Sequence, residues 1–221
     1  MKRTVLISGA GGLIGFEAAK TYLLRGFRVV GVDNNMRKQF FGQNGDVTKN
    51  ISNLTKIGKA NYIHAFVDIR NREELLKIFV EYRPDIIIHC AAQPSHDLAA
   101  TIVFDDFDVN AVGTLNMLET TRNICKEAIF IHMSTNKVYG DRPNRAKLIE
   151  TETRFDLSDT PEGFDENLSI DNSLHSLFGA SKCAADILAQ EYGKYFGMNV
   201  GIFRGGCLTG PHHNSVSLHG F

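Results

Sequence analysis

The sequence predicts an α/β fold, a doubly wound parallel sheet with helices on both faces. Two observations support this prediction. Short apolar runs alternate with segments of helical spacing along most of the chain, and the first such run ends in a glycine-rich turn that leads into a helix. Right-handed crossovers between the strands would place bound ligands at their carboxyl ends.

In the first half of the chain, residues 3–8 form an apolar run that ends in glycines, which is typical of a buried parallel strand. Residues 13–25 have helical spacing, and Gly26 is a plausible helix stop. A second strand is expected at 27–33. The polar, glycine-containing stretch 34–60 predicts a loop.

The second half continues the alternation. After a third strand at 62–67, Asn71 is expected to cap a helix over 71–82 that has acids in its first turn. The remaining expected elements are strands at 85–90, 128–133 and 199–204, and helices at 105–125 and 174–196.

Composition limits the classes of function. The 221 residues fit one domain, and 43% hydrophobic with 22% charged residues is ordinary for a globular protein. A net charge of −1 predicts neither a nucleic-acid partner nor a membrane partner. No apolar run approaches the roughly 20 residues that span a bilayer, and glycines interrupt the N-terminal run, so no signal peptide is expected. The cysteines form no CxxC pair, which predicts reduced thiols in a cytoplasmic protein and no metal site.

The glycine-rich turn carries the clearest chemical signal. Gly9, Gly12 and Gly15 are spaced G-x-x-G-x-x-G between a strand and a helix, as a Rossmann-type dinucleotide site requires. Gly9 would permit the tight turn, Gly12 the close approach of a pyrophosphate, and Gly15 the packing of helix on strand. The helix N-terminus would offer amides to the phosphates. The alternative is an ordinary structural turn.

Two acids at strand ends extend this prediction. Asp33 ends the second strand, where a carboxylate can accept hydrogen bonds from the adenosine ribose and would repel a 2′-phosphate. An acid with this role favours NAD over NADP. The alternative is that Asp33 is a solvated acid at the end of the strand. Asp68 follows the third strand and is expected to reach the adenine amine, with a helix-capping acid as the alternative.

With these motifs, the chain resembles the extended short-chain dehydrogenase/reductases, a family of NAD-dependent nucleotide-sugar epimerases and dehydratases. The matching stretches are SGAGGLIG, VDNN, VDIR, HCAAQ, DVNAVGTLNMLE, MSTNKVYGD, FGASK and FRGGCLTGP, in the family's order. The stretches STNKVYGD, ETETRFD and PEGFDEN most resemble the branch of cytidine-diphosphate-sugar 2-epimerases.

The resemblance implies roles for individual residues. Thr135 matches the catalytic Ser or Thr, and Lys182 matches the catalytic lysine that also holds the nicotinamide ribose. For these two, a strand-end turn and a solvated helix lysine are the alternatives. Asn110 matches an asparagine near the cofactor that stabilises the central sheet. The other implied cofactor contacts are Leu13, Ile14, Asn34, Ile69, Cys90, Ala91, Ala92 and Gln93.

The chain also departs from the family's pattern. Phe178 stands where a catalytic tyrosine is expected, and Cys207 stands where a polar residue helps bind the substrate's phosphates. The resemblance implies an NAD-binding domain over 1–204 and a truncated substrate-binding portion over 205–221, so that the C-terminal substrate domain is largely absent. The acidic insertion 141–173 is expected to be either a lid over the site or a solvated loop.

The expected activity is epimerisation of a nucleotide-diphosphate sugar at C2, by transient abstraction and return of a hydride. A 4,6-dehydratase or 4-epimerase, and a catalytically impaired NAD-binding sensor or scaffold, are the alternatives. Thr135 could relay the proton through water, and the conceivable replacements for the tyrosine are Tyr139, His175, Cys183 and His96. By analogy with the family, the helices at 105–125 and 174–196 would form a homodimer.

Overall fold

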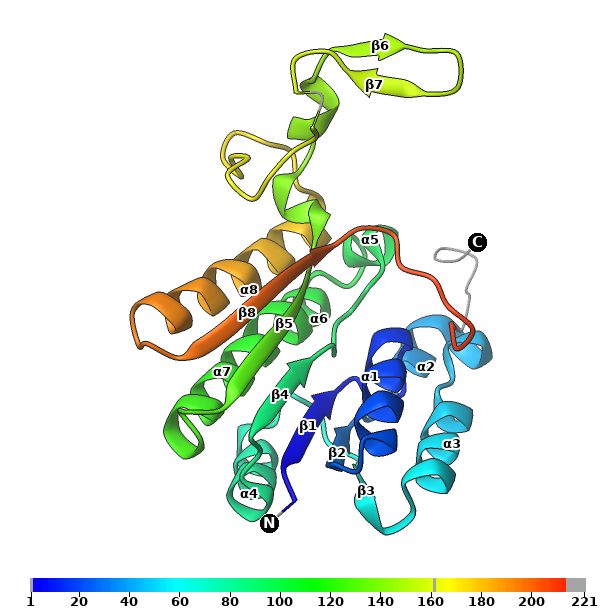
Figure 1. Cartoon of the computed structure of the whole chain (residues 1–221), viewed down its shortest axis with the longest axis vertical. Helices are drawn as coiled ribbons and strands as arrows, with labels where there is room; N and C mark the ends of the chain where they lie inside the picture. Colours follow the sequence, from blue (N-terminus) through cyan, green and yellow to red (C-terminus); the bar gives the residue numbers. More distant parts are fainter. Residues whose placement is uncertain (1, 161, 214–221) are drawn as a thin grey trace.

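A six-stranded parallel sheet forms the centre of the protein, with the strand order β3-β2-β1-β4-β5-β8. This computed structural model describes residues 2–160 and 162–213. The strands are β1 (Thr4–Ser8), β2 (Arg28–Val32), β3 (Tyr62–Ala65), β4 (Ile86–His89), β5 (Ile129–Thr135) and β8 (Asn199–Gly205). The order runs outward from β1 in both directions, so the predicted doubly wound fold is confirmed (Figure 1).

Helices cover both faces of the sheet and bury two apolar clusters. On one face, α1 (Leu13–Leu24) and α3 (Thr48–Gly58) pack against β1 and β2 through side chains such as Phe16 and Leu54. On the other face lie α4 (Arg72–Tyr82), α7 (Gly113–Ile124) and α8 (Ser176–Lys194), which bury Phe79, Met117 and Phe130. The strands read as continuous apolar runs because both of their faces are buried.

The prediction of a loop over 34–60 was wrong. This stretch contains α2 (Met36–Phe41) and α3, joined by a short 3-10 turn. In α3 one apolar stripe, with Leu54 fully buried, packs on α1, while most other positions are polar. The polar composition hid this stripe, because tertiary packing rather than composition stabilises such a helix.

The helix expected over 105–125 is interrupted. It begins with α6 (Val103–Phe107), passes through a π-helical turn at Asp108–Val112, and continues as α7. The short helix α5 (His96–Ala99), with Ser95 as its N-cap, precedes it and was not predicted. The π turn buries Asn110, which lies 1% exposed.

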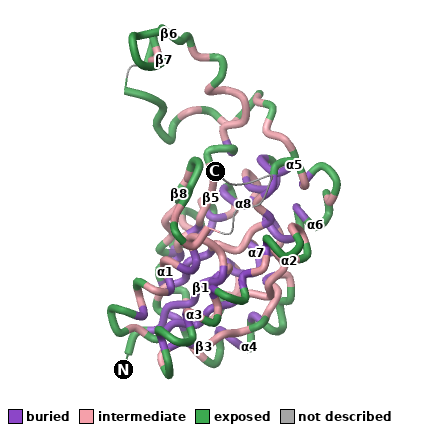
Figure 2. The backbone as a smooth tube through the Cα atoms, turned by 90° about the vertical axis from the view of Figure 1, so that its right-hand side faces the viewer, coloured by how far each residue is buried: buried purple, intermediate pink, exposed green. Residues whose placement is uncertain are grey.

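The insertion 141–173 projects away from the sheet (Figures 1 and 2). It contains a 3-10 turn at Arg142–Arg145 and a hairpin of β6 (Leu148–Glu150) and β7 (Phe155–Leu157), in which Leu148 and Phe155 are exposed. Whether it closes over the site as a lid stays a prediction. So do the predicted domain limits, and residues 214–221 of the last segment lie outside the described residues.

None of the helices in the described ranges is long and apolar enough to cross a bilayer.

Candidate cofactor and active site

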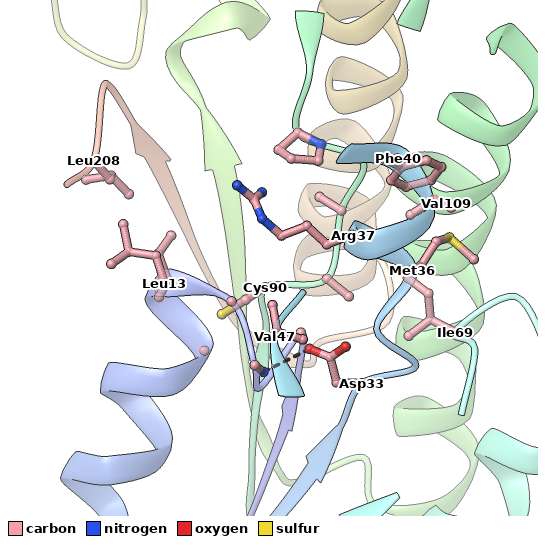
Figure 3. Close-up of a pocket in the computed structure, with 18 of the residues that line it drawn as sticks. Leu13, Asp33, Met36, Arg37, Phe40, Val47, Ile69, Cys90, Val109 and Leu208 are labelled. Carbon is pink, nitrogen blue, oxygen red and sulfur yellow. Dashed lines mark hydrogen bonds between the residues drawn. The ribbon is translucent and has the colours of Figure 1, made fainter. Parts of the chain in front are cut away.

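A cavity of about 540 Å³ opens where β1, β2, β3, β4 and β5 reach their carboxyl ends (Figure 3). This is where a doubly wound sheet binds its ligands. The cavity is lined by Gly9, Gly11, Gly12, Leu13, Ile14, Gly15, Val32, Asp33, Asn34, Met36, Arg37, Phe40, Val47, Val67, Asp68, Ile69, Cys90, Ala91, Ala92, Pro94, His96, Val109, Thr135, Asn136, Lys137, Phe178, Gly206, Cys207, Leu208, His212 and His213.

The glycine loop has the geometry of an anion site. Gly9 has a φ of +69°, and a Cβ on Gly15 would lie 2.0 Å from the carbonyl oxygen of Gly9. A Cβ on Gly12 would meet only that same oxygen, at 3.3 Å, so Gly12 leaves room for a ligand. In the described part of the chain no side chain caps the N-terminus of α1, so its first amides can bind phosphate.

Asp33 lies beside the glycine loop. One of its carboxylate oxygens accepts the Gly11 amide at 2.8 Å, shown by the dashed line in Figure 3, and the other accepts the Asn35 amide at 2.8 Å. Burial raises the pKa of Asp33, and these two backbone hydrogen bonds oppose the rise. Each oxygen keeps a lone pair that can accept a ribose hydroxyl. That contact stays a prediction.

Asp68 lines the cavity and pairs with Arg70, whose guanidinium nitrogens lie 2.8 and 3.2 Å from its carboxylate. Burial raises the pKa of Asp68, but the hydrogen bonds from Arg70 outweigh it, and the net pKa is lowered. The cap of α4 is Asn71, as predicted, since its side chain accepts the Glu74 amide at 3.2 Å. The carboxylate of Asp68 is therefore not the side chain that caps this helix.

The residues after β4 divide into two groups. Cys90, Ala91 and Ala92 line the cavity, whereas Gln93 and Asn110 do not and are buried. The Asn110 side chain accepts the Gln93 amide at 2.9 Å and donates to Asp106 and Ser181 at 3.1 Å. The side chain of Asn110 therefore fixes the backbone of the loop at Gln93. The contacts of both residues with a cofactor stay predictions.

The three residues of the predicted catalytic group differ in their surroundings. Thr135 lines the cavity, and its hydroxyl also accepts the Lys137 amide at 3.2 Å, which is the strand-end turn named as the alternative. Phe178 lines the same cavity with 9% of its surface exposed. Lys182, one helical turn further on, does not line the cavity. It lies 4% exposed and donates to the carbonyl oxygen of Met133 at 3.0 Å. Burial lowers the pKa of Lys182 to about 8.

Of the four conceivable replacements for the missing tyrosine, only His96 lines the cavity. The hydroxyl of Tyr139 accepts from Arg204 at 2.8 Å, and a ring nitrogen of His175 lies 2.8 Å from the carbonyl oxygen of Ile170. Cys183 is half-buried, and burial raises its pKa. His96 is thus the one of the four that a ligand in the cavity could touch.

Part of the cavity lining was not predicted from the sequence. Met36, Arg37 and Phe40 come from α2, inside the stretch predicted as a loop, and Arg37 points into the cavity in Figure 3. Gly206, Leu208, His212 and His213 come from the segment after β8. The segment after β8 begins within the family-like stretch FRGGCLTGP, but no cofactor contact was predicted for it. The helical spacing within 36–41 is the only signal that could have indicated α2.

The comparisons with known proteins agree with this geometry. The model of the "NAD dependent epimerase/dehydratase family" matches residues 5–219. The chain is 35% identical over 206 residues to the CDP-paratose 2-epimerase of Salmonella typhi, a match that covers 93% of this chain and 57% of that protein. The chain thus spans little more than half the length of this curated relative.

Solved structures share the fold. The UDP-glucose 4-epimerase of Thermus thermophilus, in complex with NAD, superposes with a TM-score of 0.67 at 26% identity, covering 95% of this chain and 57% of that one. The dTDP-glucose 4,6-dehydratase of Streptomyces venezuelae, with NAD bound, gives a TM-score of 0.73 at 20% identity, with the same coverage. The family model matches nearly the whole chain, and the chain therefore belongs to the NAD dependent epimerase/dehydratase family.

Proposed function

We propose that this chain is the NAD-binding portion of a nucleotide-sugar epimerase of the CDP-sugar 2-epimerase type. The observation that carries the proposal is that one cavity is lined both by the glycine loop with Asp33 and by Thr135 with Phe178. Such a cavity can hold a dinucleotide with its reactive end beside a sugar. The likeness to CDP-paratose 2-epimerase supports the choice of a cytidine-diphosphate sugar.

The residues present fit NAD. The uncapped N-terminus of α1 and the open space at Gly12 suit a pyrophosphate, and Asp33 suits the adenosine ribose. Leu13, Ile14, Asn34, Asp68 and Ile69 would complete the wall around the adenosine half. Cys90, Ala91 and Ala92 would lie along the dinucleotide where it crosses the sheet.

NAD, when bound, would supply the acceptor and donor of a hydride. The chain's own residues would handle the proton and the substrate oxygen. The Thr135 hydroxyl can donate to the sugar oxygen whose carbon exchanges the hydride. Lys182, buried one turn beyond Phe178, would keep positive charge near that oxygen. It does not itself line the cavity, so its contact with the nicotinamide ribose stays a prediction.

The acid–base group differs from the family's pattern because Phe178 cannot exchange a proton. We propose that His96 is the first candidate for this role, since it lines the cavity while Tyr139, His175 and Cys183 do not. A relay from Thr135 through water is the second. Phe178 also favours one different function, a catalytically impaired NAD-binding protein that acts as a sensor or scaffold. A 4,6-dehydratase or 4-epimerase uses the same cavity and stays an alternative.

The test has two stages. Calorimetry with NAD should show binding by the wild type and weakened binding by Asp33→Ala. Absence of NAD binding by the wild type would contradict both the epimerase and the sensor. Absorbance at the nicotinamide band is then followed after adding cytidine-diphosphate sugars, with uridine- and thymidine-diphosphate sugars as controls. Reduction of NAD that is lost in His96→Gln supports the displaced base. NAD binding with no reduction in the wild type, but reduction in Phe178→Tyr, supports the impaired protein.

The cellular location and the oligomeric state are also proposals. We propose a cytoplasmic protein, because the four cysteines are unpaired thiols. A homodimer through α7 and α8 follows from analogy with the family alone. Sedimentation velocity would test the dimer.

A further inference from the structure

We infer that residues 206–213, here called the strap, form the outer wall of the dinucleotide site, and that His212 latches the strap to α1. The inference rests on the proposed binding of NAD. It adds His212, Glu17 and Asn50 as residues that retain the cofactor, none of which belongs to the glycine motif or to the predicted catalytic group.

The path of the strap brings it over the cavity. After β8 ends at Gly205, the chain crosses the carboxyl ends of the neighbouring strands and arrives beside α1, α2 and α3, as the red segment in Figure 1 shows. Cys207, Leu208, His212 and His213 line the cavity along this path. A ligand on the glycine loop would therefore lie between that loop and the strap.

His212 makes two contacts with α1. Its Nδ1 lies 2.5 Å from Oε1 of Glu17, so the ring donates to the carboxylate. Its ring also lies over Phe16, with centroids 4.1 Å apart, and Phe16 is only 1% exposed in the core. The side chains of His212 and Glu17 are 28% and 40% exposed, so the pair is partly shielded from water. Together, a tilted ring contact and a hydrogen bond to a carboxylate hold the strap against α1.

Asn50 connects the strap to the glycine loop. This α3 residue is 5% exposed, and its amide nitrogen donates to the carbonyl oxygen of Gly11 at 2.8 Å and to that of His212 at 3.3 Å. Gly11 in turn donates its own amide to Asp33. One buried side chain therefore sets the spacing between the strap and the loop that would hold the pyrophosphate.

The consequence is kinetic. A strap that is latched in place is already organised before the cofactor arrives, and a bound cofactor must displace it or slip past it to leave. Loss of the latch should therefore speed dissociation of NAD more than it slows association. Glu17 and His212 should act as one unit, so their effects should not add.

The experiment measures NAD binding to the whole chain by stopped-flow fluorescence. His212→Ala and Glu17→Gln are each expected to raise the dissociation rate constant roughly tenfold, and the double variant no further. Lys20→Ala is the matched control, because Lys20 lies 3.8 Å from Glu17 on the same helix and makes no hydrogen bond or ion pair with the described residues of the strap. Its dissociation rate should match that of the wild type.

Hydrogen exchange in NAD-free protein distinguishes failure of the latch from failure of the proposed NAD binding. Peptides covering 206–213 should exchange faster in His212→Ala than in the wild type, whatever NAD does. Normal NAD binding by the wild type with an unchanged dissociation rate in both latch variants overturns the strap and leaves the proposed function standing. If the wild type binds no NAD, the proposed function fails, and equal exchange in the variant and the wild type then overturns the latch as well.

Discussion

Lys182 is a deeply buried residue for which a catalytic role is predicted. Its ammonium group lies 4% exposed and donates to one backbone carbonyl, at Met133. Burial lowers its pKa from 10.5 to about 8, while Asp186, Cys90 and Asp106 oppose the fall. An ammonium held in this way costs stability in the folded state, because burial removes its hydration and one carbonyl oxygen replaces only part of it.

That cost predicts a pH dependence of the free energy of unfolding. Because the folded pKa lies below the unfolded one, the unfolded chain holds the proton more tightly, and stability rises as the pH climbs from about 8 to 10.5. The full difference corresponds to about 3 kcal/mol. We expect Lys182→Met to stabilise the protein at pH 7 by about 1–3 kcal/mol, since the lost hydrogen bond offsets part of the gain.

Urea unfolding at a series of pH values measures this effect. The advantage of Lys182→Met should shrink toward pH 10.5. Lys194→Met, at an exposed position at the end of the same helix, should show no such trend. Equal pH dependence of Lys182→Met and the wild type between pH 8 and 10.5 would refute the prediction.

At the scale of the element, the first turn and α1 could be predicted almost completely from sequence. The glycines, the apolar strand before them and the helix after them are all local signals, and Gly9, Gly12 and Gly15 line the cavity as expected. The stretch 34–60 could not be predicted in this way, because α3 packs on α1 through few apolar side chains. Met36, Arg37 and Phe40 were missed because α2 is a six-residue helix with no buried residue, so no buried apolar stripe marks it.

The glycine loop gives a matched pair of variants. In Gly15→Ala the new Cβ would lie 2.0 Å from the Gly9 carbonyl oxygen, so backbone must shift. We expect a loss of about 1–3 kcal/mol in the free energy of unfolding. In Gly12→Ala the nearest atom is 3.3 Å away, so stability should change by less than about 1 kcal/mol while NAD affinity falls at least roughly tenfold.

Chemical unfolding and calorimetry on the two variants distinguish these effects. Gly12→Ala serves as the control for stability, because it adds the same methyl group to the same loop. A Gly12→Ala protein less stable than Gly15→Ala would contradict the closer packing at Gly15 than at Gly12.

At the scale of the whole molecule, the sheet order assembles a site that no single segment encodes. Strands β1, β2, β4 and β5 end at one edge, which brings Gly12, Asp33, Cys90 and Thr135 around one cavity. The order of alternating elements predicts this convergence, and so the core of the site could be located from sequence. The strap could not, because its place depends on His212 reaching Glu17 across nearly the whole length of the chain.

The same assembly buries two histidines under α7 and α8. His89 is held between Ser8 and Thr114, at 2.6 and 2.9 Å, and stacks on His132 with centroids 5.5 Å apart. Neither ring nitrogen of His132 has a hydrogen-bond partner among the described residues. Burial lowers the pKa of His89 to about 3, and it lowers the pKa of His132 well below its ordinary value of 6.5.

These two histidines should make the protein sensitive to acid. Below pH 6.5 the imidazoles of the unfolded chain bind protons, whereas those of the folded protein stay neutral. The free energy of unfolding therefore decreases as the pH decreases, by up to about 1.4 kcal/mol per pH unit for each ring. His132→Phe keeps a ring of similar shape and removes one of the two titrating groups. We expect its stability relative to the wild type to rise as the pH falls from 8 to 5. His96→Gln, on the exposed side chain of α5, is the control and should follow the wild type. Urea unfolding between pH 8 and 4 measures the difference, and parallel curves for His132→Phe and the wild type would show that His132 does not resist protonation in the folded state.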